Sequence, residues 1–267
     1  MLEAFLTAPI DDDSGQITLA VTPDEETAQT GGAQLGATLP ADGYIVGGPT
    51  GLDVCPAARG NFGGEVVLSG ERAHASDPAA GTNPIQLVGP LLEALNQYDG
   101  CCGPDAHELL GPPTLTPTRI AGGDQLSQIP ATCTVGFDRR TVPPETIDAF
   151  LDGLRAHLAE SLPEAAAFEV RPAYPDSPSP DAFATDRDAD LVQMLATASG
   201  GEIRPFEAAT EASYLAVNAP TVVFGPGVLV DEEGPVAHAD REYVSRASIA
   251  TAADVLSRTV AAMLSRS

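Results

Sequence analysis

The sequence predicts an α/β fold made of two units, with the smaller unit inserted into the larger one. Short apolar, β-branched runs alternate with amphipathic helical segments near both ends of the chain, and the middle of the chain has a different order of elements. The 267 residues, 43% of them hydrophobic, are ample for a core and fit two ordinary domains. We therefore expect residues 1–58 and 174–267 to form one α/β domain, incomplete at its N-terminus, and residues 59–173 to form the inserted unit.

The first part of the larger domain alternates helix and strand. Residues 1–8 have helical periodicity, and Gln16–Ala20 is an apolar run that predicts a buried strand before an acidic turn. A short helix over 31–39 and a strand over 44–46 follow. The second strand leads into Gly48-Pro49-Thr50.

The inserted unit is predicted to contain four strands and two helices. In chain order these are a strand over 62–70, a helix over 84–98, strands over 114–120 and 131–139, a helix over 145–161 and a strand over 167–172. The order β-α-β-β-α-β is that of a ferredoxin-like unit.

A proline-rich linker over 172–180 then leads back to the larger domain. A helix over 190–199, strands over 203–206 and 221–224 and a helix over 246–264 complete the prediction. In such a fold we expect the functional site at the carboxyl ends of the strands.

The charge balance excludes several classes of partner. The chain has 13 Lys+Arg against 38 Asp+Glu, a net charge of −25. Phosphate binding depends on basic side chains, so we expect no nucleic-acid partner and no anionic membrane. The composition is typical of adaptation to a high-salt cytoplasm, where charges are screened within about 3 Å at about 1 M salt.

Four cysteines are present, at positions 55, 101, 102 and 133, and none has C-x-x-C spacing. This spacing argues against a zinc-thiolate site and for a reduced compartment. With no leader and no apolar run of membrane-spanning length, we expect a soluble, cytoplasmic protein.

A cluster of carboxylates and a distant histidine suggest a metal site. Asp24, Glu25 and Glu26 are adjacent, so each raises the pKa of the others unless a cation or solvent relieves them. His238 lies far along the chain, after a Gly-Pro-Gly turn. Carboxylates and a histidine are suitable ligands for a divalent metal ion. The alternative is a solvated acidic turn.

Six motifs occur in a fixed order: Pro23-Asp24-Glu25-Glu26, Gly48-Pro49-Thr50, Ala73-His74-Ala75-Ser76, Asp138-Arg139-Arg140-Thr141-Val142-Pro143, Gly225-Pro226-Gly227 and His238. Together they resemble the zinc-dependent family of succinyl-diaminopimelate desuccinylases, acetylornithine deacetylases, aminoacylases and G-type carboxypeptidases. The acidic composition looks most similar to the haloarchaeal desuccinylases. The resemblance implies a metallopeptidase-type catalytic α/β domain, with the inserted unit as a lid that forms a homodimer.

By motif position, the resemblance implies that Glu25 is the general base and that Glu26 and His238 bind the metal, zinc or cobalt. In the lid, it implies that His74 reaches toward the oxyanion of a neighbouring subunit's site. It also implies that Arg140 binds the substrate carboxylate. A surface histidine at position 74 and a salt bridge from Arg140 stay open as alternatives.

The chain also departs from the family pattern. The family's His-x-Asp strand does not occur, so the chain begins downstream of half of the metal site. Gly48 stands where most relatives have a ligating carboxylate, and Ser127-Gln128-Ile129-Pro130 lacks the lid asparagine. Glu26 and His238 are then two ligands, whereas catalytic zinc normally has three.

Three functions follow from these observations. The first is a metal-dependent hydrolase of an N-acyl amino acid, with N-succinyl-diaminopimelate in lysine biosynthesis as the favoured substrate and impaired activity in this chain. The second is a non-catalytic, dimerising relic. The third is one piece of a two-piece enzyme. An acetylornithine deacetylase or carboxypeptidase type remains an alternative within the first.

The charge balance also makes a testable prediction about salt. At millimolar ionic strength the 38 acidic residues repel one another without screening, so the fold should loosen. Far-UV circular dichroism in molar KCl and in dilute buffer measures this change. An unchanged spectrum would contradict the prediction.

Overall fold

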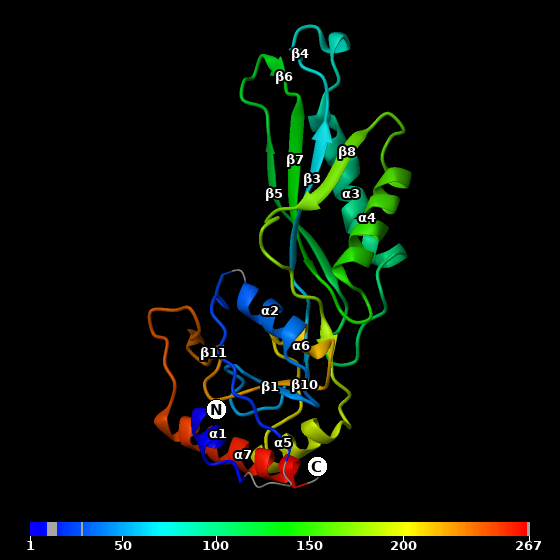
Figure 1. Ribbon diagram of the computed structural model, residues 1–267. Helices are drawn as coiled ribbons and strands as arrows, with labels where there is room; N and C mark the ends of the chain where they lie inside the picture. The colour runs from blue at the N-terminus through cyan, green and yellow to red at the C-terminus, as the bar shows by residue number, and fades with distance from the viewer. Residues whose placement is uncertain (10–14, 28, 266–267) are drawn as a thin grey trace. The chain divides into compact units, whose positions relative to one another are not determined.

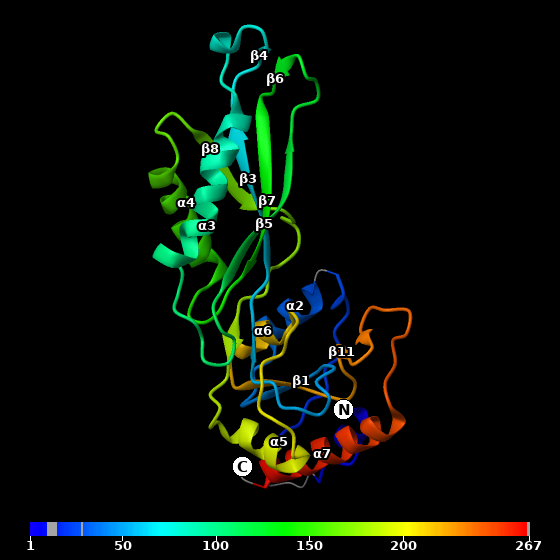
Figure 2. The ribbon, with the colours of Figure 1, turned by 180° about the vertical axis from the view of Figure 1, so that it is seen from behind.

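The computed structural model describes residues 1–9, 15–27 and 29–265 (Figures 1 and 2). The chain forms two compact units. The first unit combines residues 1–58 with residues 183–267, and the second unit contains residues 59–182. Each unit has its own core, so each is described by itself.

A pair of parallel strands lies at the centre of the first unit. β1 (Tyr44–Gly47) pairs with β10 (Thr221–Phe224), with Tyr44 opposite Thr221. Two short antiparallel pairs accompany them: β2 (Ala57–Ala58) with β9 (Phe183–Ala184), and β11 (Val230–Asp231) with β12 (Gly234–Pro235).

Helices cover both faces of this pair of strands (Figure 1). On one face lie α1 (Leu2–Leu6), α5 (Asp190–Ser199) and α7 (Arg246–Leu264), and on the other lie α2 (Thr30–Thr38) and α6 (Ala212–Ala216). Side chains alternate along a strand, so Val222 and Phe224 of β10 join the core beneath α5 and α7, whereas Val223 joins the core beneath α6. The first unit is therefore a three-layer α/β/α arrangement.

The long helix α7 meets the length and hydropathy of a membrane span, whereas the sequence was expected to contain no such run. This is weak evidence for a membrane. Ala252, Val255 and Leu256 of α7 are buried in the core that α5 shares, and Arg258 pairs with Asp254 at 2.9 Å on its surface. In this unit α7 forms part of the outer helical layer.

Two predicted strands of the first unit are absent from the described structure. Residues 16–20 alternate between half-buried and exposed, but they form no strand because no neighbouring strand supplies hydrogen bonds within the described residues. Residues 203–206 form only isolated bridges, Val54 with Ile203 and Ala58 with Phe206. A strand requires a partner, which local composition does not reveal.

The second unit contains a four-stranded antiparallel sheet. Its strands are β3 (Phe62–Ser69), β5 (Thr114–Gly122), β7 (Thr132–Arg140) and β8 (Ala167–Pro172), in the spatial order β5-β7-β3-β8. With α3 (Val88–Cys101) after β3 and α4 (Ile147–Ser161) after β7, this is the predicted ferredoxin-like βαββαβ topology. Minor elements are β4 (Ala73–His74), β6 (Gln128–Ile129) and the 3₁₀ turns η1 (Pro78–Ala80) and η2 (Pro84–Leu87).

Local signals explain where the helices of the second unit begin. Asn83 accepts a hydrogen bond from the Ile85 backbone N–H at 3.1 Å, ahead of the turn that leads into α3. Thr146 caps α4 by accepting from the Ala149 N–H at 3.2 Å. Both helices pack their apolar faces on one side of the sheet, where Phe150 is fully buried.

Arg139 lies fully buried in this core, near the end of β7. Its guanidinium donates to Asp99 of α3 and, at 2.7 Å, to Glu145 just before α4. The same group stacks over the rings of Tyr98 and Phe150, with 4.6 Å between the guanidinium carbon and the Phe150 centroid. One cation thus joins the sheet to both helices.

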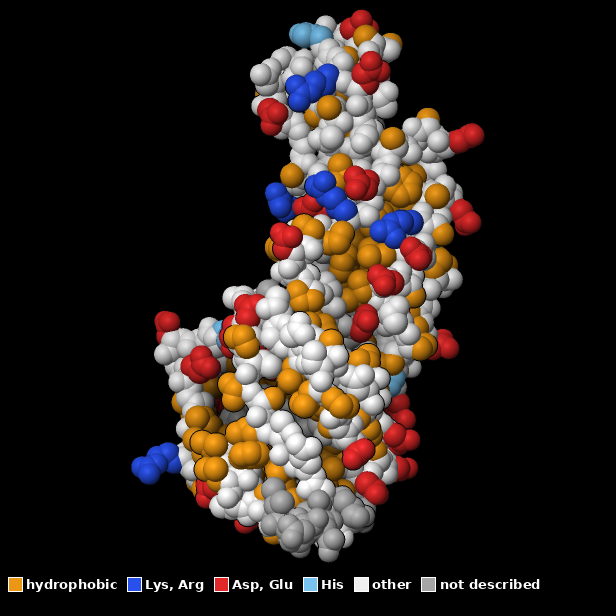
Figure 3. Space-filling view, viewed as in Figure 1, with side chains coloured by type: hydrophobic (Ala, Val, Ile, Leu, Met, Phe, Trp, Pro, Cys, Tyr) orange, Lys and Arg blue, Asp and Glu red, His pale blue; other side chains and the backbone are white. Residues whose placement is uncertain are grey.

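The other face of the sheet is polar. Glu65 of β3 pairs with Arg171 of β8 at 3.0 Å and with Arg119 of β5 at 4.0 Å. Space-filling Figure 3 shows acidic side chains scattered widely and few basic ones on the visible face. Exposed pairs of this kind contribute little stability, about 0–1 kcal/mol each.

Residues 174–182 group with the second unit, although the predicted boundary lies before them. Asn61 N–H donates to the Pro180 carbonyl at 3.0 Å, and Ile147 N–H donates to Asp181 at 2.7 Å. These bonds hold the returning segment against β3 and against the start of α4.

The buried arginine generates a stability prediction. Arg139→Met should lower the free energy of unfolding of the second unit by about 3–5 kcal/mol, because Asp99 and Glu145 lose their cation inside the protein. Urea unfolding in molar KCl, followed by the near-UV circular dichroism to which buried Tyr98 contributes, measures this loss. The matched control is Arg155→Met, which breaks an exposed pair with Asp152 and should change stability by about 0.5 kcal/mol or less. Equal effects of the two substitutions would contradict the structural role of Arg139.

Candidate functional site

The acidic motif forms a tight turn. Asp24 adopts a left-handed conformation, with φ of 74°. Its backbone carbonyl accepts from the Gln29 N–H at 2.8 Å, and its carboxylate accepts from the hydroxyls of Thr27 and, at 2.9 Å, Thr30. These bonds fix the turn, and the exposed side chains of the two following glutamates project from it.

His238 lies on a loop that follows β12. The residue has φ of 59°, in the left-handed region that histidine enters more often than most residues. Arg241 pairs with Asp231 and donates to the Gly234 carbonyl at 2.9 Å, and the Tyr243 hydroxyl donates to Asp231 at 3.0 Å. The pKa of Asp231 is lowered, mainly by the Arg241 hydrogen bond. This network fixes both sides of the His238 loop.

The structure brings Glu26 and His238 into direct contact. The distance from His238 Nε2 to Glu26 Oε2 is 2.8 Å, although 211 residues separate them along the chain. Their side chains remain 69% and 74% exposed, so solvent reaches this pair freely in the first unit. The two side chains predicted to bind the metal therefore meet.

Glu25 lies beside this pair in an acidic environment. Burial raises its pKa above the ordinary 4.5, and the carboxylates of Glu26 and Glu211 raise it further. A 3.4 Å hydrogen bond from Gln29 and the charge of His238 oppose the rise. A carboxyl group with a raised pKa next to a histidine has the character required of a general base.

Glu211 is a site residue to which sequence analysis gave no role. It accepts a hydrogen bond from the Thr22 hydroxyl at 2.7 Å, and its Oε2 is shielded from solvent without a hydrogen-bond partner in the described residues. It stands just before α6, where a side chain at Gly32 of α2 would collide with it. Its only sequence signal is a Thr-Glu pair ahead of small residues, which is common on protein surfaces.

Two glycine motifs meet at the carboxyl ends of β1 and β10. Thr50 is fully buried, and its hydroxyl accepts from the Gly225 N–H at 3.1 Å. A Cβ at Gly225 would lie 2.6 Å from the Gly48 carbonyl oxygen, and a Cβ at Gly48 would lie 2.6 Å from buried Val223. The side chains of Val223 and Phe206 leave no space for a carboxylate side chain at position 48, so this position supplies no side-chain ligand.

His74 occupies the end of β4 in the second unit. Its Nδ1 lies 2.7 Å from the Ser76 hydroxyl and accepts from the Ser76 N–H at 3.2 Å. The ring is exposed, and an Nδ1 that accepts leaves its proton on Nε2. The histidine therefore presents an N–H donor to solvent.

Arg140 forms the salt bridge that sequence analysis kept as its alternative role. Its Nε and Nη2 donate to the two carboxylate oxygens of Asp138 at 2.8 and 3.2 Å. About a third of each side chain remains exposed. To bind a substrate carboxylate, the Arg140 guanidinium would use its remaining N–H donors or give up its hydrogen bonds to Asp138.

The donor set at Glu26 and His238 suits a divalent metal in kind. A carboxylate oxygen and an imidazole nitrogen on one tetrahedral zinc ion lie roughly 3.4 Å apart, so their 2.8 Å contact needs only a small opening of two exposed side chains. The nearby charges of Glu25 and Glu211 also favour a cation. In the described part of the chain, no third His, Cys, Asp or Glu completes a compact ligand cluster around them.

Comparison with known proteins finds similarity to peptidases and deacetylases. A family model described as the peptidase dimerisation domain of the M20 family matches residues 57–166. The acetylornithine deacetylase of Aliivibrio fischeri strain MJ11 is 28% identical over 268 residues, which cover 97% of this chain and 68% of that protein. The chain is therefore similar to the M20 metallopeptidases and amidohydrolases. The enzyme of the same name from Edwardsiella ictaluri is 30% identical, over 85% of this chain and 59% of its own length.

Solved structures of peptidases share the fold of this chain. Aminopeptidase PepT from Bacillus cereus superposes with a TM-score of 0.67 at 17% identity, over 91% of this chain and 63% of its own. The YXEP protein of Bacillus subtilis, described as a dinuclear metal-binding peptidase, gives a TM-score of 0.63 at 15% identity, over 91% of this chain and 64% of its own. The chain spans about two thirds of the length of these relatives. The narrower likeness to haloarchaeal desuccinylases stays a prediction.

The geometry predicts weak zinc binding at Glu26 and His238. Two protein ligands on exposed side chains should give micromolar or poorer affinity, and His238→Ala should abolish the binding. Competition with a zinc indicator measures the affinity, in a background where Cys101 and Cys102 are serine so that thiols do not contribute. His107→Ala, which removes a histidine of the second unit, is the control. Tight binding of two zinc ions would show that other ligands complete the site.

Proposed function

We propose that this protein takes part in metal-dependent hydrolysis of the amide bond of an N-acyl amino acid. The observation that carries the proposal is the contact of Glu26 with His238 beside Glu25, whose pKa is raised. The match to the M20 peptidase dimerisation-domain model supports the proposal, as does the similarity to proteins named acetylornithine deacetylases.

Each site residue has a proposed role. Glu26 and His238 would hold a divalent ion, zinc or cobalt. When bound, such an ion polarises a carbonyl and lowers the pKa of water. Glu25 would accept the proton of the attacking water on its carboxylate and deliver it to the leaving amine. Burial, followed by the charges of Glu26 and Glu211, raises the pKa of Glu25 and thus its basicity for this transfer.

The second unit would contribute to substrate binding. Arg140 would bind the substrate carboxylate through its planar guanidinium, and the exposed Nε2–H of His74 would donate to the developing oxyanion. By the family resemblance, that oxyanion belongs to the site of a neighbouring subunit.

Two substrates are proposed. The relatives' name favours an N-acetyl amino acid such as N-acetylornithine. The motif wording favours N-succinyl-diaminopimelate, the substrate preferred on sequence grounds. Both compounds present an amide beside a carboxylate, which suits Glu25 and Arg140 equally.

We also propose a homodimer formed through the second unit. The matched family model is described as a dimerisation domain. β5 pairs only with β7 among the described residues, and its residues from Thr118 onward are exposed. An open edge of this kind invites pairing across a two-fold axis, with α3 beside it.

The roles of the site residues predict a pattern of activity. The 267-residue chain, with two ligands, should hydrolyse either substrate slowly in molar KCl with added zinc or cobalt. Glu25→Gln should lower that rate by ~10²–10⁴-fold, without changing metal content. Glu242→Gln, which changes an exposed glutamate near His238, is the control.

The same role of Glu25 predicts how the rate depends on pH. Because the base must be ionised, the rate should rise with pH through a pKa above 4.5. Turnover that survives Glu25→Gln would exclude Glu25 as the base, and absence of turnover together with a stable dimer would favour the non-catalytic alternative.

The edge strand predicts the state of assembly. Sedimentation in molar salt should show twice the 27.4 kDa mass of the chain. Ile120→Glu, on the exposed edge strand β5, should yield monomer because like charges would face each other across the two-fold axis. Ile249→Glu, on the exposed side of α7, should leave the dimer intact. A wild-type monomer would overturn the proposed assembly.

A further inference from the structure

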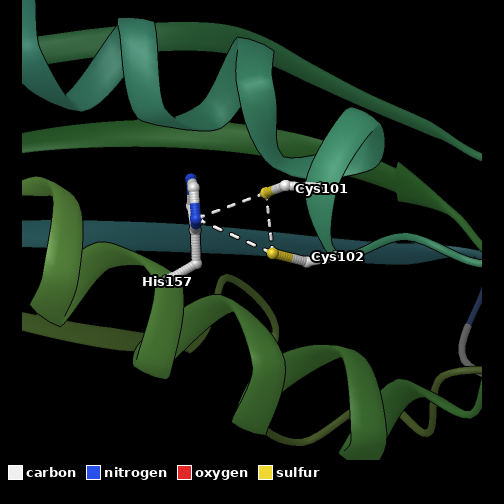
Figure 4. Close-up of side chains that lie close together, drawn as sticks. All are labelled: Cys101, Cys102 and His157. Carbon is white, nitrogen blue, oxygen red and sulfur yellow. Dashed lines mark hydrogen bonds between the residues drawn. The ribbon is translucent and has the colours of Figure 1, made fainter.

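A cluster of two thiols and an imidazole lies on the second unit, and none of its three residues has a role in the site proposed above. Cys101 ends α3, Cys102 is the next residue, and His157 projects from α4 (Figure 4). His157 Nδ1 lies 3.6 Å from the Cys101 sulfur and 3.8 Å from the Cys102 sulfur, and the sulfurs are 2.7 Å apart. These atoms form the one compact group of three metal-ligand atoms found in the described residues.

The histidine is oriented to donate its lone pair to this group. Its Nε2 lies 2.9 Å from the backbone carbonyl oxygen of Ala94, and a carbonyl can only accept, so the ring proton resides on Nε2. The ring also packs edge-on against buried Tyr98, with 5.7 Å between centroids. Metal-binding histidines usually hold their second nitrogen in this way, which leaves Nδ1 unprotonated and aimed at the metal.

The surroundings favour a cation over free thiolates. The cluster lies at the carboxyl end of α3, where the helix dipole is negative. Both cysteines are free and exposed. A positive ion that replaces the two thiol protons would interact favourably with this negative end of the helix.

We propose that Cys101, Cys102 and His157 form a binding site for one thiophilic divalent ion of the zinc class. Around a tetrahedral zinc ion, with bonds of about 2.3 Å to sulfur and about 2.0–2.1 Å to nitrogen, sulfur and nitrogen lie roughly 3.6 Å apart. The two sulfur–nitrogen distances already have nearly this value. Only the sulfurs must separate, to roughly 3.8 Å, by rotation of exposed side chains.

The binding step is balanced by the release of protons. Each thiol gives its proton to the buffer as its sulfur bonds to the ion, and Nδ1 contributes its lone pair without proton release. The fourth position faces solvent, where water completes the coordination. The ion would tie the end of α3 to α4 in the unit that carries the dimerisation-domain match. Sequence spacing conceals this site because the third ligand lies on a helix more than fifty residues further along the chain.

Cobalt(II) distinguishes binding at this site from binding at Glu26 and His238. Thiolate ligands give a sulfur-to-cobalt charge-transfer band in the near ultraviolet, and a carboxylate and an imidazole do not. The full chain is reduced with a phosphine, freed of metal and titrated with cobalt(II). We expect the band to saturate at one equivalent, and zinc(II) to remove it. Affinity should increase with pH, because two protons leave on binding.

Matched variants decide the assignment. Cobalt binding should weaken at least ten-fold in each of three variants: Cys101→Ser, Cys102→Ser and His157→Ala. The His157→Ala protein keeps both thiols, so its loss of affinity would show that the imidazole is a ligand. Cys133→Ser, which removes a buried cysteine, and His238→Ala should leave the band unchanged. If His157→Ala does not fold, the two exposed serine variants still test the site. No band at one equivalent, a band that survives in both serine variants, or unchanged affinity in a folded His157→Ala protein would overturn the proposal.

Discussion

The buried Arg139 guanidinium is the interaction on which the second unit depends. A fully buried cation is tolerated only with its charge and its donors satisfied, and here Asp99, Glu145 and two aromatic rings provide this. Because these partners come from α3, from the start of α4 and from the core between them, the ion network fixes where both helices end or begin relative to β7. The apolar residues around it could pack in several ways, whereas the charge network fits one arrangement.

The neighbouring residue shows how a one-residue step on a strand changes the role of an arginine. Successive side chains point to opposite faces of a sheet, so Arg139 enters the core and Arg140 reaches the polar face. All 13 basic residues of the chain are arginine, and in the described part of the chain eight of them form ion pairs. The few arginines, set against 38 acidic residues, include some that connect separate segments of the chain. Arg241, for example, bonds to the Gly234 carbonyl and so fixes the loop that carries His238. Arg140 is half-exposed and bonded to one aspartate, so it is among those with capacity for a further anion.

Much of the fold was predictable because it depends on local periodicity. The helices predicted over 84–98 and 145–161 correspond to α3, with the turn η2 before it, and to α4, and the four predicted strands of the second unit occur in the predicted ferredoxin-like order. The strands predicted over 16–20 and 203–206 were wrong: the first has no paired strand within the described residues, and the second forms only isolated bridges instead of a continuous ladder. The acidic motif and His238 were paired by family resemblance, and no spacing rule could have brought them together. Glu211 and the Cys101, Cys102 and His157 cluster were missed because tertiary packing assembles them from ordinary sequence.

The backbone argues against a merely solvated acidic turn. Asp24 and His238 both adopt positive φ, and each lies within two residues of the Glu26–His238 contact or forms part of it. Such conformations are unfavourable by of order 1–3 kcal/mol and persist only where surrounding contacts hold them. Thr27 and Thr30 hold Asp24, while Asp231, Arg241 and Tyr243 hold the His238 loop. An acidic turn that was only solvated could relax to an unstrained backbone conformation. Here two separate hydrogen-bond networks maintain the positive φ angles, one on each side of the carboxylate–imidazole contact. This convergence fits the metal-binding role proposed for the two loops.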